Sequence, residues 1–440
     1  MTIEPITAVI ITIPVLLGML LCGLPVYASL GITGLIGTFL IGGLNFGLVQ
    51  LRPLPYSVTA SYLLVAVPLF IIMGNFAFHA GLTRDVYDFS HKWLSRFRGG
   101  LGLATALASG LFAACCGSSV ATAATMGTVA VPEMERYGYD SKLACGIVAA
   151  GGSLGVMIPP SILLVLYASL TGTSAGHMLI AGIIPGVLQM TVYMVGIKIM
   201  AQLNPSLTPI AEKVPWRERF ASIKKIWQIA LLFIIVLGGI YVGWVTPTEA
   251  AAVGAVGAFM LMVVYRKRID GKLWPKIANS FTDSMRTTVM VFTVIIGASI
   301  YSFFLTVAEV PQMLCAWAGS APVPPIAVLL MFAIIYIVLG MFLDSISLML
   351  VTLPIMFPVV VDVFGMSPIW FGVISTMLCE IGLITPPVGL NVYVLSGVVR
   401  HVSLPDIFRG CLPFVLMGLV VLAFLFSFHG LATWLPATMR

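Results

Sequence analysis

Two proline pairs, each in the middle of a long apolar segment, are the strongest chemical feature of the chain. Pro159-Pro160 and Pro386-Pro387 lie 227 positions apart, and each pair follows a glycine, Gly155 or Gly382. A proline pair removes two backbone donors and stops the preceding helix, which leaves carbonyl oxygens without partners. Hydrocarbon cannot hydrogen-bond these oxygens, so a broken membrane helix persists only where it lines a polar cavity. Paired breaks of this kind indicate the substrate and ion site of a secondary transporter.

The same offset of 227 positions relates residues well beyond the prolines. The matched residues either break helices or carry a side-chain oxygen, and no gap is needed to align them. We therefore predict an internal repeat. The matched pairs are Ser118 with Ser345, Thr125 with Thr352, Gly138 with Gly365, and Gly155 with Gly382.

The residues around the two breaks suit a cation bound beside an anion. Unpaired carbonyl oxygens in the segments 151–157 and 382–388 are suitable ligands for a hard cation such as sodium. The side chains of Thr385 and Asn391 add two further oxygens. Helix N-termini near a break present N–H groups and a positive dipole end, which favour a carboxylate.

Three carboxylates fall inside apolar segments: Asp344, Glu249 and Glu380. An ionisable group there costs about 2.5–3.5 kcal/mol or more, so it usually has a partner or a function. Asp344 lies at the expected start of a helix, where it can cap the helix or also bind a cation. Glu249 follows a proline at the start of a span, which favours a structural role in the first helical turn. Glu380 precedes the second break, and its role stays open between sensing a proton and holding a neighbouring hydroxyl.

Hydroxyl side chains lie at the turn of the first repeat that is equivalent to the turn with Asp344 in the second. Ser118 and Ser119 lie at this turn, and Thr122 follows them. Serine caps helices as readily as it binds ligands, so both roles remain open at this point.

The composition identifies a polytopic α-helical membrane protein. Hydrophobic residues make up 60% and charged residues 9% of the 440 residues, and the mean hydropathy is +1.10. Because soluble domains carry about 25% charged residues, a soluble fold is excluded. The first seven residues contain Glu4 but no lysine or arginine, so a cleavable signal peptide is not expected.

Lysine and arginine gather in three loops, at 84–98, 213–225 and 266–276. The positive-inside rule makes these loops cytoplasmic. A path through the membrane that satisfies all three loops places both the N-terminus and the C-terminus in the periplasm.

Two segments, 99–134 and 322–361, are expected to form re-entrant helical hairpins. Each has two apolar arms around a polar tip, and the arms of the first are shorter than the roughly 20 residues of a full crossing. Broken helices at 141–173 and 367–400 follow them. The first hairpin then opens to the cytoplasm and the second to the outside, so the repeats are inverted. The alternative treats both hairpins as ordinary spans of a channel or a scaffold.

An intramembrane enzyme is the competing class, and the motifs that it needs are missing. Proteolysis would require a Ser/His pair, two opposed aspartates or a zinc motif. None of the five histidines lies mid-span beside a serine or an acid in the sequence, and no HExxH or Walker motif occurs. We therefore expect no enzymatic activity, and an ion gradient rather than ATP as the energy source.

Five motifs occur in order over most of the chain: Gly117-Ser118-Ser119, Gly138-Tyr139-Asp140, residues 155–161, residues 246–254 (TPTEAAAVG) and residues 382–391 (GLITPPVGLN). Together they resemble the large membrane subunit of tripartite ATP-independent periplasmic (TRAP) transporters, the DctM-like family. The resemblance implies an elevator-type transporter, in which a mobile part that carries both hairpins slides past a scaffold. The expected divisions are scaffold spans at 1–98, a first transport element at 99–203, scaffold spans and basic loops at 204–308, a second transport element at 309–409, and a C-terminal span at 410–440.

The resemblance also implies where the transported solutes bind. One sodium ion, Na⁺, would bind at Ser118, Ser119 and carbonyls near Gly151, Gly155 and Met157. The other would bind at Asp344, Thr385, Val388 and Gly389. The organic acid would lie between the two tips, near Ser118, Ser119, Thr122, Ser345, Ser347 and Asn391.

Two partner proteins are implied in the same way. A small four-helix membrane subunit (DctQ-like), expected as a separate chain, would assist in the bacterial inner membrane. A soluble periplasmic binding protein (DctP-like) would capture and deliver an organic acid, such as a C4-dicarboxylate or sialic acid. The alternatives are a stand-alone sodium/dicarboxylate symporter and, less favoured, a channel.

Overall fold

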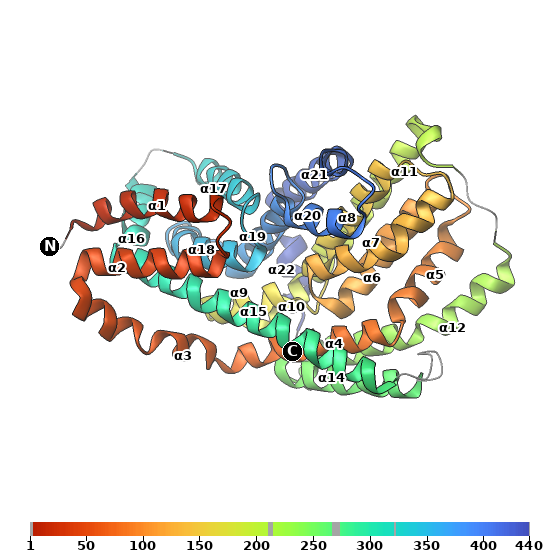
Figure 1. The fold of residues 1–440 in the computed structure, drawn as a ribbon, viewed down its shortest axis with the longest axis horizontal. Helices are drawn as coiled ribbons and strands as arrows, with labels where there is room; N and C mark the ends of the chain where they lie inside the picture. The colour runs from red at the N-terminus through yellow and green to blue at the C-terminus, as the bar shows by residue number, and fades with distance from the viewer. Residues whose placement is uncertain (1–2, 210–213, 266–272, 321–322, 440) are drawn as a thin grey trace.

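The structure is a computed structural model that describes residues 3–209, 214–265, 273–320 and 323–439, and its elements there are helices (Figure 1). Lys213, residues 266–272 of the third basic loop and residue 322 of the second hairpin lie outside the described residues. Within the described residues, eight helices are long and apolar enough to cross a membrane, or nine spans if one bent pair is counted. The predicted all-α polytopic fold is confirmed.

Among the N-terminal helices, α1 to α3 (red) lie at the left of Figure 1, and α4 and α5 (orange) lie farther to the right. The second of them bends at Gly43, whose φ of +76° favours glycine. These elements are α1 Pro5–Leu21, α2 Val26–Leu51, α3 Leu54–Thr59, η1 Tyr62–Val65, α4 Ala66–His79 and α5 Leu82–Leu94.

The first predicted hairpin is a pair of packed helices, α6 (Gly100–Cys116) and α7 (Ser119–Arg136). Gly117 adopts a φ of +63°, which ends α6. The Ser118 hydroxyl accepts the Ala121 N–H (3.4 Å) and starts α7. These two residues explain why the turn is so short.

The first predicted broken helix consists of α8 (Ser141–Met157) and α9 (Ile162–Thr171), bent by 41° at the proline pair. Asp140 starts α8 by accepting the Leu143 N–H (3.0 Å). Beyond the prolines, the Ser161 hydroxyl accepts the Leu164 N–H (3.3 Å) and restarts the chain as α9.

The second half repeats this order of elements. Its helices begin near the residues that the offset of 227 predicts; α8 begins at Ser141, for example, and α19 at Pro368. The two glycines that precede α8 and α19, Gly138 and Gly365, both have positive φ, at +80° and +65°. The helix boundaries therefore support the internal repeat. The elements are α17 Pro325–Gly340, α18 Ser345–Pro358, the π-helical turn η5 Val359–Val363, α19 Pro368–Leu383 and α20 Leu390–Val398.

The remaining helices surround these two units, and α15 is the longest, with 35 residues. It crosses the molecule in Figure 1 and packs against α2, α4 and α18. A Cβ on Gly34 of α2 would lie 2.7 Å from the Tyr301 Cα of α15, so glycine permits this close approach. These elements are α10 Ala175–Ala181, α11 Ile183–Leu203, η2 Pro205–Leu207, α12 Trp216–Phe233, η3 Ile234–Gly238, α13 Gly239–Val242, α14 Pro247–Val264, α15 Leu273–Val307, α16 Val310–Ser320, α21 Leu404–Ser427 and α22 Gly430–Ala437.

The C-terminal segment differs from the single span expected at 410–440. The long helix α21 begins earlier, at Leu404, and ends at Ser427. Phe428 leaves the helical conformation (φ −126°, ψ 81°), and α22 follows as a separate short helix that packs against α10.

Helices α8 and α21 touch at two glycines, which leads to a stability prediction. A Cβ on Gly410 would overlap the Lys142 carbonyl oxygen, and a Cβ on Gly146 would overlap the Gly410 carbonyl. We expect Gly410→Ala to force the helices apart at a cost of about 1–3 kcal/mol and to lower the unfolding temperature by several degrees. Gly397→Ala is the matched control, because its Cβ would meet nothing within 4 Å. Equal unfolding temperatures of the two purified variants would contradict the close contact.

Candidate functional site

A cavity of about 610 Å³ lies where the two hairpin turns, the two helix breaks and α15 meet. Its wall is mostly apolar, and its polar groups gather at the two turns. A cavity of this kind, with a few convergent polar groups, is the usual form of a small-molecule site. The predicted site residues that line it are Ser118, Ser119, Asp344, Ser345 and Val388.

The first hairpin turn lies against the first helix break. A Cβ on Gly155 would be 2.9 Å from the Ser118 carbonyl oxygen and 3.0 Å from Thr122 Oγ1. Thr122 donates its hydroxyl to that same carbonyl oxygen (2.8 Å). The structure therefore brings together Ser118, Thr122 and Gly155.

Two residues predicted for the first sodium site face other parts of the structure. Gly151 packs against the Ser109 side chain of α6, and the Met157 carbonyl oxygen lies against Gly182. Neither residue is among the described residues that line the cavity.

Asp344 at the second turn caps α18. Its Oδ2 accepts the N–H groups of Ile346 and Ser347 (3.1 Å each), and the Ser347 hydroxyl donates to Oδ1. The capping role is confirmed, while cation binding by Asp344 stays a prediction. Asp344 also lines the cavity, so its charge is available to a solute bound there.

The second helix break is tied directly to the second turn. The Gly389 N–H donates to the Met341 carbonyl oxygen (3.2 Å), and Gly389 has a φ of +54°. The Thr385 hydroxyl donates to the Ile381 carbonyl oxygen (2.6 Å), so its proton is bonded to a carbonyl in the last turn of α19. Val388, which lies between Thr385 and Gly389 in the sequence, lines the cavity.

Glu380 joins the two hairpin turns. Ser119 Oγ donates to its Oε2 (2.7 Å), and Ser345 Oγ donates to its Oε1 (3.0 Å). The Glu380 side chain is fully buried behind the two serines. The sequence indicated this residue only as a carboxylate before a helix break, and one of the two roles left open, holding a neighbouring hydroxyl, is the one observed.

Asn391 connects the two repeats. Its Nδ2 donates to Ser119 Oγ (2.7 Å) and to the Ala149 carbonyl oxygen (3.3 Å) of α8. Because Asn391 is on α20, this side chain ties the second broken helix to the first turn and to the first broken helix. Its Oδ1 is buried and has no protein partner among the described residues.

The site combines features that suit both charges. Helices α7 and α18 begin at Ser119 and Ser345, which line the cavity, so their N-terminal N–H groups and positive dipole ends are close to it. These groups favour a carboxylate. The side-chain carboxylates of Asp344 and Glu380 lie at or directly behind the same two turns, and they favour a cation.

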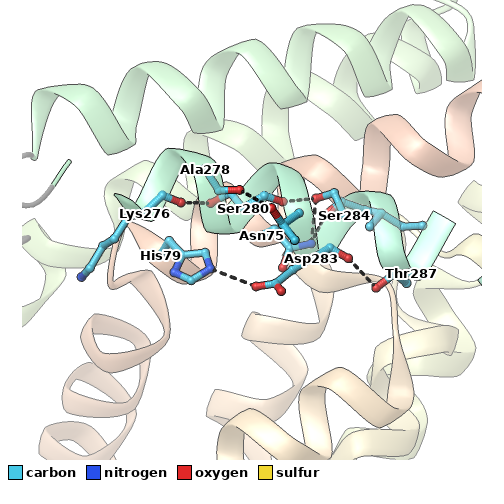
Figure 2. Close-up of polar contacts among 10 residues, drawn as sticks. Asn75, His79, Lys276, Ala278, Ser280, Asp283, Ser284 and Thr287 are labelled. Carbon is cyan, nitrogen blue, oxygen red and sulfur yellow. Dashed lines mark hydrogen bonds and ion pairs between the residues drawn. The ribbon is translucent and has the colours of Figure 1, made fainter. Parts of the chain in front are cut away.

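A second polar cluster, between α4 and α15, has a structural role (Figure 2). Asn75 Nδ2 donates to Ser284 Oγ (2.9 Å), and His79 Nε2 lies 3.6 Å from Asp283 Oδ2. The proximity of His79 and Asp283 could not be predicted from the sequence, because the two residues are on different helices. The Ser284 hydroxyl donates to the Ser280 carbonyl oxygen (2.6 Å), so the pair has no nucleophile oriented by the histidine.

Glu249 has the structural role that the sequence favoured. Its carboxylate accepts the Thr246 N–H (2.7 Å), and the Thr246 hydroxyl accepts the Glu249 N–H (3.3 Å). This capping box starts α14.

Comparison with protein families gives one match, over residues 13–431. The matching family is described as the DctM component of tripartite ATP-independent periplasmic transporters.

Relatives of this chain include transporter permeases that are similar over nearly their whole length. The C4-dicarboxylate TRAP transporter large permease protein DctM of Pseudomonas aeruginosa is 39% identical, covering 87% of this chain and 86% of the relative. The sialic acid TRAP transporter large permease protein SiaM of Vibrio cholerae is 31% identical, covering 96% of each chain.

Solved structures with a similar fold include the YdaH transporter of Alcanivorax borkumensis. The TM-score is 0.60 with 16% sequence identity, covering 87% of this chain and 89% of the other. At this identity the likeness concerns the fold alone.

Proposed function

The chain belongs to the DctM family of tripartite ATP-independent periplasmic (TRAP) transporters, and we propose that it imports an organic acid with sodium as the coupling ion. As a TRAP large permease it is a multi-pass membrane transporter and not an enzyme. The observation that carries the proposal is the cavity between the two hairpin turns, where helix N-termini meet a buried carboxylate.

The proposed substrate is a carboxylate. The relatives from P. aeruginosa and V. cholerae are named for C4-dicarboxylate and sialic acid, and both compounds carry carboxylate groups. The N-termini of α7 and α18 at the cavity favour such a group.

Sodium is proposed at each of the two turns. Ser118, Ser119 and Gly155 lie together at the first turn, and Asp344, Val388 and Gly389 lie together at the second. Oxygen ligands from hydroxyls, carbonyls and one carboxylate suit a hard monovalent cation. The Thr385 carbonyl at the second helix break is a further ligand in the proposal, whereas Gly151 and Met157 are left out because they face other parts of the structure.

Transport is proposed to follow an elevator mechanism, with the repeats inverted in the membrane. The elements within 99–203 and 309–409 move against the scaffold elements of 1–98 and 204–308, and the continuous helix α21 moves with the first set because it packs closely on α8 at Gly146 and Gly410. Arms α6 and α17 have 17 and 16 residues, which supports re-entrant hairpins because a full crossing needs about 20. The segment Ser345–Val363, by contrast, is long enough to cross.

Membership of the family implies two partners, a periplasmic binding protein and a small membrane subunit. We propose that they act with this chain in a bacterial inner membrane, and that both of its termini face the periplasm. The binding protein would deliver the organic acid to the outward-facing cavity.

Sodium coupling is tested by the substitution Asp344→Asn. Asparagine keeps the shape and can still cap α18, but it removes the charge beside the cavity. We expect uptake into proteoliposomes that also contain the small subunit, with the binding protein supplied and an inward sodium gradient, to need about tenfold more sodium for half-maximal rate, equivalent to about 1.4 kcal/mol. The amount of folded protein, measured by size-exclusion chromatography, should stay near the wild-type value. An unchanged sodium dependence would reduce Asp344 to a helix cap.

A further inference from the structure

The hydrogen bonds around Glu380 determine which hydroxyls of the cavity face a sodium ion and which face a substrate carboxylate. We propose that Glu380 is a positioning residue that turns the oxygens of Ser119 and Ser345 toward a cation, and that Ser118 is left as the hydroxyl that binds the substrate carboxylate. This inference rests on the sodium-coupled carboxylate uptake proposed above, and it refines the ligands given there: the Ser118 hydroxyl moves from the first sodium site to the substrate, and Ser345 joins the cation ligands.

The direction of the two serine hydrogen bonds follows from the chemistry of the groups. In the proposal Glu380 is ionised; an ionised carboxylate can only accept, and a hydroxyl has a single proton and two lone pairs. Ser119 and Ser345 therefore donate their single hydroxyl protons to Glu380 Oε2 and Oε1, respectively. Both serines line the cavity, and toward it they can offer only lone pairs. Lone pairs bind a cation and repel a carboxylate.

Asn391 strengthens this orientation at Ser119. Its Nδ2 group is a pure donor, so Ser119 Oγ must accept from it (2.7 Å). The two Nδ2 protons are thereby used for Ser119 and for the Ala149 carbonyl oxygen (3.3 Å). The Asn391 side chain consequently has no N–H left for a substrate, although the sequence resemblance placed Asn391 among the substrate contacts.

The remaining hydroxyls predicted for the substrate differ in whether their proton is free. Thr122 donates to the Ser118 carbonyl oxygen, and Ser347 donates to Asp344. Ser118 Oγ accepts the Ala121 N–H, and its own proton has no acceptor among the described residues. Ser118 lines the cavity next to the N-terminus of α7, where a carboxylate is favoured.

The charge of Glu380 also calls for a cation nearby. Its side chain is fully buried, and none of the ion pairs within the described ranges includes it. A buried charge without an opposite charge is strongly unfavourable. A sodium ion on the far side of Ser119 and Ser345 would supply the opposite charge through two aligned hydroxyl dipoles.

The substitution Glu380→Gln separates this role from simple packing. Glutamine has nearly the same shape, but its amide NH₂ donates to one of the serines. That serine must then accept, and its proton turns toward the cavity, where it repels a cation. We expect about tenfold weaker sodium binding. In contrast, a packing role for Glu380 would leave sodium binding unchanged as long as the protein folds.

Sodium alone is the probe. The unfolding temperature of the purified full-length chain is measured as sodium chloride replaces choline chloride at constant ionic strength. Glu249→Gln is the matched control. It also replaces a glutamate by glutamine, but Glu249 belongs to the capping box of α14, which glutamine can still form, and it does not line the cavity. The combined variants Glu380→Gln/Ser345→Ala and Glu380→Gln/Ser119→Ala test whether Glu380 acts through the serines.

We expect the wild type and Glu249→Gln to be stabilised at the same sodium concentration, and Glu380→Gln to need about tenfold more. In each combined variant, sodium binding should be weakened by less than the product of the fold-changes measured for Glu380→Gln and for the serine substitution alone.

A wild-type response in Glu380→Gln overturns the inference, and so does strict additivity in both combined variants. If Glu380→Gln does not fold, Ser345→Ala carries the test, since it removes a proposed ligand; an unchanged response would overturn the inference. A wild type that does not respond to sodium overturns the sodium coupling of the proposed function instead.

Discussion

Proteoliposomes that contain this chain and its small membrane subunit will accumulate an organic acid only when sodium and the cognate periplasmic binding protein are both present. We expect uptake to fall to the background of empty vesicles when either is withheld. The measurement is the concentrative uptake of the radiolabelled acid that the binding protein retains on purification.

The physical reason lies in what the chain can capture by itself. A cavity of about 610 Å³ at the hairpin turns is its proposed solute site, and a domain that could trap a dilute solute needs about 50 residues or more. The connections between the helices of the described residues are short. We therefore expect a separate protein to capture the solute, as membership of a tripartite family implies.

Two rival mechanisms predict different results in the same assay. A stand-alone sodium/dicarboxylate symporter would accumulate the acid with sodium alone, and a channel would equilibrate it without sodium or binding protein. Robust concentrative uptake without a binding protein would reject the tripartite assignment. A non-cognate binding protein of similar size and charge is the control for nonspecific stimulation.

The features of the fold that could be predicted from the sequence depend on local chemistry. The proline pairs end α8 and α19, and Gly138 and Gly365 end the helical segments before them, because each acts on its own backbone. Asp344 could be recognised as a possible cap for the same reason. Such residues carry their structural effect in any context, so the internal repeat could be detected without a structure.

The arrangement of the site could not be predicted, because it depends on contacts between distant residues. The hydrogen bond from Ser119 to Glu380 spans 261 positions, and the one from Asn391 to Ser119 spans 272. The direction of a backbone carbonyl likewise depends on packing: Met157, expected to bind sodium, places its oxygen against Gly182, which lies between α10 and α11. The sequence indicates which residues near each break carry oxygens, but not the direction in which each oxygen points.

A disulfide between the scaffold and the first broken helix will stop transport almost completely if the elevator mechanism is correct. Ser61, just before η1, and Ser169, on α9, have their hydroxyl oxygens 3.2 Å apart. Cysteine differs from serine by one atom, so Ser61→Cys/Ser169→Cys places two thiols within reach of each other. In the proposed mechanism Ser61 belongs to the scaffold and Ser169 to the moving part, and a covalent bond between them prevents the sliding step.

We expect oxidation of the double variant to reduce sodium-driven uptake more than tenfold, and a reducing agent to restore it. Each single variant, oxidised in the same way, is the matched control; it cannot form this bond, although the chain has seven native cysteines. Mass spectrometry of the peptides that contain residues 61 and 169 shows how completely the bond forms. Because a mechanism with a fixed α9 would tolerate the bond, normal uptake by fully cross-linked protein would reject movement of this element past the scaffold. The carboxylate cavity and its bridging Glu380 would then have to open through motion of the hairpin turns alone.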